Sequence, residues 1–64
     1  MYKFKRTANN KALERLGYNQ GQKVCIYDSQ QVVRAGQKYW TLYYKVYNIN
    51  TKKMEWVDSF YFSK

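Results

Sequence analysis

The side chains that most often carry catalytic chemistry are sparse in this sequence. It contains no histidine, the commonest general acid and base in enzymes. Its carboxylates are scattered and show no paired spacing: Glu14, Asp28, Glu55 and Asp58. The single cysteine, Cys25, has no histidine to activate it, and we interpret it as a half-buried structural residue. We therefore expect no enzymatic activity, no cofactor and no metal site.

The charge balance instead indicates binding to a polyanion. Twelve Lys and Arg residues against four Asp and Glu residues give a net charge of +8 over 64 residues. Such an excess costs self-repulsion, which an anionic partner would offset. Aromatic residues make up 20% of the chain, and eight of them are tyrosines. Because bases stack on flat rings and lysines neutralise phosphates, we predict nucleic acid, and DNA rather than RNA, as the partner.

The clearest candidate binding surface lies on one side of a predicted strand. Tyr39, Tyr43 and Tyr47 recur there with Lys45 between them. Arg34 is the candidate for reading bases, since a guanidinium can pair bidentately with guanine. The full set of predicted contacts from this part of the chain is Arg34, Lys38, Tyr39, Tyr43, Lys45, Tyr47, Lys52 and Lys53. Two other interpretations stay open: the face is covered as a second core layer, or it is an interface between two copies of the chain. The alternative function is that of a protein-binding modulator or inhibitor of a host or phage enzyme complex, with the aromatic face as its interface.

A second basic cluster lies near the N-terminus, on a predicted strand and on the outer stripe of a predicted helix. It consists of Lys3, Lys5, Arg6, Lys11 and Arg15. We expect these residues to contact phosphates if they converge into one patch. The alternative is an ordinary solvated surface.

The N-terminal half is expected to contain two strands and one helix. Alternation predicts a strand over residues 2–6. A short helix is predicted over residues 7–16, with Gly17 as its left-handed stop. A strand over residues 23–28 follows, then a polar break at residues 28–31 and a brief pairing of Val32 and Val33.

Residues 39–62 are predicted to form a long β-hairpin. Trp40, Leu42, Tyr44 and Val46 alternate with polar residues and tyrosines, and residues 48–53 are rich in turn formers. In the returning strand the predicted apolar face is Met54, Trp56, Phe60 and Phe62, interrupted by Asp58.

The predicted fold class is α+β and mostly β, in a single domain spanning residues 1–64. We expect a small twisted antiparallel sheet of three to five strands with one short N-terminal helix. That arrangement is compatible with an SH3-like half-open barrel and equally with a three-stranded sheet backed by the helix.

Neither a membrane-spanning segment nor a signal peptide is recognisable, and with a lone cysteine we expect a cytoplasmic protein. The short chain, rich in Tyr, Asn and Lys, resembles small basic accessory proteins of bacteriophages and mobile elements from low-GC Gram-positive bacteria. Among these it is similar in size and charge to recombination directionality factors. The resemblance implies binding to attachment-site DNA, to an integrase, or to both, in a bacterial host, and self-association is a further expectation. It carries over no functional residue.

Overall fold

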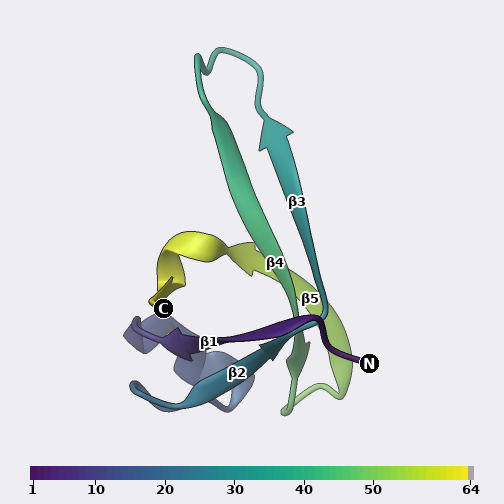
Figure 1. Ribbon diagram of the computed structural model, residues 1–64. Helices are drawn as coiled ribbons and strands as arrows, with labels where there is room; N and C mark the ends of the chain where they lie inside the picture. The colour runs from purple at the N-terminus through teal and green to yellow at the C-terminus, as the bar shows by residue number, and fades with distance from the viewer. Residues whose placement is uncertain (64) are drawn as a thin grey trace.

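The computed structural model describes residues 1–63 and shows two three-stranded antiparallel sheets packed against each other (Figure 1). The first sheet has the order β2-β1-β6 and the second has the order β3-β4-β5. The strands are β1 (Phe4–Ala8), β2 (Lys23–Ile26), β3 (Asp28–Val33), β4 (Trp40–Asn48), β5 (Lys53–Asp58) and β6 (Phe62–Ser63). Two 3-10 segments complete the fold, η1 (Lys11–Leu16) and η2 (Ser59–Tyr61).

The two sheets are joined where β2 runs into β3. Only Tyr27 separates these strands, and its backbone N–H donates to the carbonyl of Lys45 on β4 over 2.8 Å. The chain therefore bends from the edge of one sheet to the edge of the other without a loop. Strand β4 is the longest of the strands and pairs with β3 on one side and β5 on the other.

The hydrophobic core lies between the two sheets and is closed by η1. Its buried residues are Ala8, Leu13, Leu16, Tyr18, Val24, Ile26, Tyr44, Val46 and Val57. An aromatic contact links the sheets, because the Tyr44 ring lies 5.5 Å from that of Phe4 and 5.7 Å from that of Phe62, measured between centroids. Aliphatic side chains make up most of this core, and the rings of Phe4, Tyr44 and Phe62 add buried area where the sheets meet.

The predicted helix over residues 7–16 is wrong. Thr7 and Ala8 belong to β1, and residues 11–16 form a 3-10 helix. Only six residues lie between the N-cap Asn10, whose Oδ1 accepts from Ala12 N, and Gly17 at φ +95°. The 3-10 geometry repeats every three residues, so Leu13 and Leu16 both face the core while Ala12 is exposed.

Gly17 is the position where the backbone around η1 tolerates least change. A Cβ atom there would lie 3.0 Å from the Cβ of Ile49, and the left-handed conformation strains any L-residue. We expect Gly17→Ala to lower the free energy of unfolding by about 1–2 kcal/mol for the backbone alone, and further for the contact. Gly21→Ala is the matched control, since Gly21 has φ +86° and nothing within 4 Å of its Cβ position. Urea unfolding should show the larger loss for Gly17→Ala, and equal losses would contradict the steric contribution.

The predicted α+β class is therefore wrong: residues 1–63 contain no α-helix, and the strands form two sheets instead of one. The α-helix is absent because the segment of residues 11–16 is too short. Two sheets form instead of one because the two ends of the chain pair with each other. Strand β6 pairs with β1, placing Phe62 opposite Ala8. No local pattern specifies that contact, and it creates the third strand of the first sheet.

Two strand assignments also need correction. The predicted polar break at residues 28–31 is part of β3, which pairs with β4 from Asp28–Lys45 to Val33–Trp40. The hairpin of β4 and β5 is confirmed from Asn48–Lys53 to Tyr43–Asp58, but the returning strand ends at Asp58. The Asp58 carboxylate accepts from Phe60 N over 2.9 Å and caps η2, so the residue predicted to interrupt an apolar face ends the strand instead.

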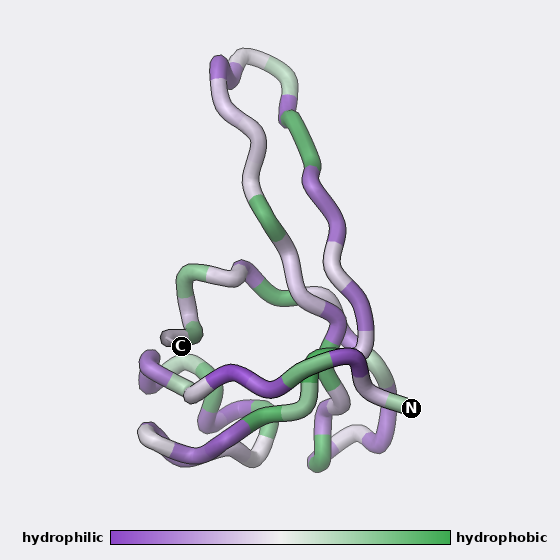
Figure 2. The backbone as a smooth tube through the Cα atoms, viewed as in Figure 1, coloured by the Kyte–Doolittle hydropathy of each residue, from purple (hydrophilic) through white to green (hydrophobic). Residues whose placement is uncertain are grey.

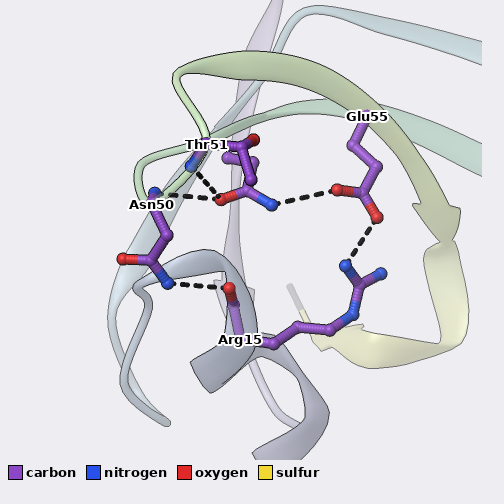
Figure 3. A network of polar contacts seen from close by, with 5 residues as sticks. Arg15, Asn50, Thr51 and Glu55 are labelled. Atoms are coloured by element: carbon purple, nitrogen blue, oxygen red, sulfur yellow. Dashed lines mark hydrogen bonds and ion pairs between the residues drawn. The ribbon is translucent and has the colours of Figure 1, made fainter.

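A hydrogen-bond network fastens η1 to the β4–β5 turn (Figure 3). The buried Asn48 side chain accepts from Asn50 N and Thr51 N at 2.9 and 3.1 Å, and its Nδ2 donates to Glu55 Oε2 over 3.0 Å. Arg15 completes the network, because its Nη1 lies 2.6 Å from Glu55 Oε1 and its carbonyl accepts from Asn50 Nδ2. The backbone of Ile49 also donates to Leu16 O.

This network makes the stability of the fold depend on pH through Glu55. Hydrogen bonding from Asn48 and then from Arg15 lowers the pKa of Glu55 below its ordinary value of 4.5. A carboxylate with a lowered pKa stabilises the fold above its unfolded-state pKa, and that contribution is lost as the pH falls through the folded-state value. We expect Glu55→Gln to be less stable than the natural chain at pH 7, by no more than about 1 kcal/mol because the ion pair is partly exposed. In urea titrations the difference should shrink below pH 4.5; a difference that grew on acidification would contradict this assignment.

Candidate nucleic-acid interface

The outward side of the second sheet carries a row of aromatic and basic residues, which we call the open face. Residues directly opposite in a sheet share a face, and the register pairs Lys45 with Trp56 and Tyr47 with Met54. Tyr43 follows the same alternation along β4. The open face is thus Tyr43, Lys45, Tyr47, Met54 and Trp56. Trp56 is 41% exposed and Met54 43% exposed, whereas their neighbour Val57, on the opposite side of β5, is buried.

Two aromatic rings of the open face lie beside cations. The Lys45 Nζ is 6.0 Å from the centroid of the Trp56 ring. The guanidinium of Arg34 lies 5.5 Å from the centroid of the Tyr43 ring and donates a hydrogen bond to its hydroxyl. Each ring therefore has a positive charge next to it. If a base stacked on the ring, that charge could bind the phosphate of the same nucleotide.

A shallow depression of about 340 Å³ adjoins these residues at the free edge of β5. Its lining consists of Arg15, Arg34, Tyr43, Trp56, Val57, Asp58 and Tyr61. Two guanidinium groups and three aromatic rings therefore border one concave region. This composition suits a flat ring and an anionic group held together, as in a nucleotide.

The margins of the open face also carry carboxylates. Asp28 pairs with Lys45 in the register and lies 3.0 Å from Lys3 Nζ, and its hydrogen bond from Lys3 lowers its pKa. Asp58 pairs with Tyr43 and caps η2. Lys3, Arg34 and Lys45 against these two carboxylates leave an excess of one positive charge. Aromatic stacking therefore distinguishes this face more than its charge does.

Lys38 and Tyr39 do not lie on the open face. They belong to a loop at the far end of β3 and β4, where residues 31–33 pair with residues 40–42 and β5 no longer accompanies them. We call residues 31–42 the arm. In Figure 1 it projects beyond the rest of the molecule. Arg34 begins its loop but folds back onto Tyr43, so this predicted base-reading residue joins the open face.

The other predicted basic residues are distributed over separate surfaces. Lys52 and Lys53 lie in and beside the β4–β5 turn, at the opposite end of β4 from the arm. The same turn is bonded to the end of η1, so Arg15 lies near it, whereas Lys11 begins η1. Lys5 lies on the first sheet opposite Cys25, and Arg6 packs its guanidinium 4.4 Å from the centroid of the Phe4 ring. The N-terminal cluster is therefore divided between the first sheet and η1.

Trp56 is the residue of this site that sequence reasoning placed wrongly. The apolar set Met54, Trp56, Phe60 and Phe62 predicted that Trp56 faces the core, yet Val57 does so. Tyr44 is buried and lies opposite Val57, so Val57 shares its core-facing side and the neighbouring Trp56 faces outward. The sequence could have indicated the exposed position of Trp56 if Trp56 had been paired with Lys45, because residues opposite each other in a sheet share a face.

Within residues 1–63, no three His, Cys, Asp or Glu side chains gather as a metal-binding group. The described residues also form no helix long and apolar enough to cross a membrane. Comparisons with protein-family models, curated proteins and solved structures give no match for this chain. Its function is therefore inferred from the side chains of the open face and their surroundings.

Proposed function

We propose that this protein is a non-enzymatic DNA-binding protein that holds unpaired bases on its open face. The observation that carries the proposal is the row of Tyr43, Tyr47 and Trp56 on the outward side of an antiparallel sheet, where Trp56 is exposed and the two tyrosines are half-buried. Arg34 and Lys45 lie beside two of these rings. Exposed rings on a sheet bind bases by stacking, which tolerates any base sequence.

The binding would divide between rings and cations. A base stacked on Trp56 gains contact area with the indole, while Lys45 stands close enough to neutralise the adjoining phosphate. Arg34 would serve the base at Tyr43 in the same way. The remaining positive charges, spread over the other surfaces, would speed association with any polyanion without fixing its position.

The resemblance to phage accessory proteins extends this proposal to a biological role. In that role the protein would act by occupying DNA or by recruiting a larger protein such as an integrase, with no chemical step of its own. The open face supplies the DNA contact that either action requires.

Fluorescence anisotropy of labelled oligonucleotides over a series of salt concentrations tests the proposal. If Arg34 and Lys45 each neutralise one phosphate, the affinity for single strands should fall by about 1.4 log units per log unit of salt, at about 0.7 per phosphate. Micromolar or tighter binding with that slope supports the proposal. A chain of net charge +8 that fails to bind oligonucleotides at low salt would overturn it.

A further inference from the structure

The arm is a second surface whose shape and composition differ from those of the open face. It is a two-stranded antiparallel ribbon with three cross-strand pairs, from Gln31–Leu42 to Val33–Trp40. Among residues 1–63, no third strand pairs with either of its backbone edges. It lies along the longest dimension of a molecule measuring 32 × 22 × 21 Å (Figure 1).

Apolar side chains on the arm are left in solvent. Val33 is 65% exposed, Trp40 is 55% exposed and Tyr39 is 78% exposed. Figure 2 shows the hydrophobic end of β3 standing well away from the core. Exposed apolar residues of this size on a projecting element indicate a surface that contacts a partner.

The charge of the arm selects the class of partner. The arm contains no acidic residue, and its two cations are Arg34, which lies against Tyr43, and Lys38 in the loop. A second copy would bring one acid-free arm against another, so like charges would oppose that pairing. A polyanion complements the arm, and Gln31, Gln37 and Thr41 add side chains that can hydrogen-bond to base edges.

The dimensions of the arm fit one groove of duplex DNA. Its three pairs advance about 10 Å at roughly 3.4 Å per residue, and the major groove is about 8.5 Å deep. Two strands about 4.8 Å apart, with side chains on both faces, enter a groove about 12 Å wide but exceed the minor groove of about 6 Å. In the major groove, Val33 and Trp40 could contact thymine methyl groups while Lys38 reaches a phosphate.

From these observations we propose that the arm inserts into the major groove of duplex DNA, as a contact separate from base stacking on the open face. The inference rests on the proposed DNA-binding function and adds the form of DNA and the element that binds it. Because β4 contributes to both surfaces, a molecule with a duplex and a single-stranded overhang would engage both at once.

The test compares two charge reversals at opposite ends of β4. Lys38→Glu alters the arm, and Lys53→Glu is the control, because Lys53 begins β5 at the far turn. Anisotropy is measured with a labelled duplex and with one of its strands, at several salt concentrations.

We expect Lys38→Glu to weaken duplex binding at least tenfold and to reduce the salt slope by about 0.9, the contribution of one neutralised phosphate. Lys53→Glu should change duplex affinity less than threefold, and Lys38→Glu should change single-strand affinity less than threefold. Circular dichroism and urea unfolding of both variants check that each is folded.

Several outcomes would overturn the inference. Equal losses for the two variants would assign duplex binding to net charge. If the natural chain binds single strands but not the duplex, the arm serves another partner, such as a protein or a second copy, while the proposed function still stands. Binding to neither form would remove the proposed function and this inference together.

Discussion

Trp56→Ala is expected to weaken binding to a single-stranded oligonucleotide about 5- to 150-fold. Stacking of a base on an aromatic side chain contributes about 1–3 kcal/mol, and each 1.4 kcal/mol corresponds to about a tenfold change in Kd. Trp56 is the largest exposed ring of the open face and the ring beside Lys45. Anisotropy titrations at fixed salt measure the change directly.

Phe60→Ala provides the matched control for that experiment. Phe60 is 80% exposed and belongs to η2, outside the open face. Removing it takes away an aromatic surface without altering Tyr43, Lys45 or Trp56, so the affinity should stay within about twofold. If both substitutions weaken binding equally, exposed aromatic area in general would account for the affinity, and the open face would lose its assigned role.

Asn48→Ala should cause the largest loss of stability among substitutions of single polar residues. Asn48 is 3% exposed and makes three side-chain hydrogen bonds, two holding the β4–β5 turn and one to Glu55. At about 0.5–1.5 kcal/mol for each bond, the free energy of unfolding should fall by about 2–4 kcal/mol. For a domain of this size the Tm should decrease by about 8–32 °C, at about 4–8 °C per kcal/mol.

The control for this substitution is Asn9→Ala, which removes the same atoms from an exposed position. Thermal and urea unfolding should place this variant within about 0.5 kcal/mol of the natural chain. A similarly small effect of Asn48→Ala would mean that the turn does not depend on its side-chain bonds. The network in Figure 3 would then not be what fastens η1 to the second sheet.

The sequence predicted the elements whose pairing is local. The β4–β5 hairpin followed from alternation along residues 40–48 and from the turn residues after Asn48, and it is confirmed. Gly17 was expected to end the segment before it, and it does so in the left-handed conformation. In both cases, the residues that decide the structure are neighbours along the chain.

Pairing between distant segments was not predictable from the same patterns. Strand β3 begins Asp28-Ser-Gln-Gln, which lacks the β-branched and aromatic residues typical of strands, and it forms because β4 supplies a partner along its whole length. Strand β6 exists only through β1. Six residues were too few to separate a 3-10 helix from an α-helix by periodicity.

The candidate site shows the same division. Tyr43, Lys45 and Tyr47 were placed on one face from alternation alone, and the structure brings them together. Trp56 was expected in the core, because its own strand offers apolar residues on both faces, and only the register with β4 decides between them. Lys38 and Tyr39 do not share a surface with Tyr43, because β5 ends opposite Tyr43 and does not extend along the arm. The sequence of β4 does not indicate where its partner strand ends.

The central claim, base stacking on the open face, is tested most directly by the fluorescence of Trp56. The two tryptophans report on different surfaces, so Trp40→Phe leaves Trp56 as the single fluorescent indole. This variant is titrated with a single-stranded oligonucleotide at low salt while binding is followed by anisotropy in parallel. Stacking predicts that Trp56 emission is quenched in proportion to the fraction bound, and that added salt reverses both signals together. Binding by anisotropy with Trp56 emission unchanged would contradict the account, since the DNA would then lie on another surface.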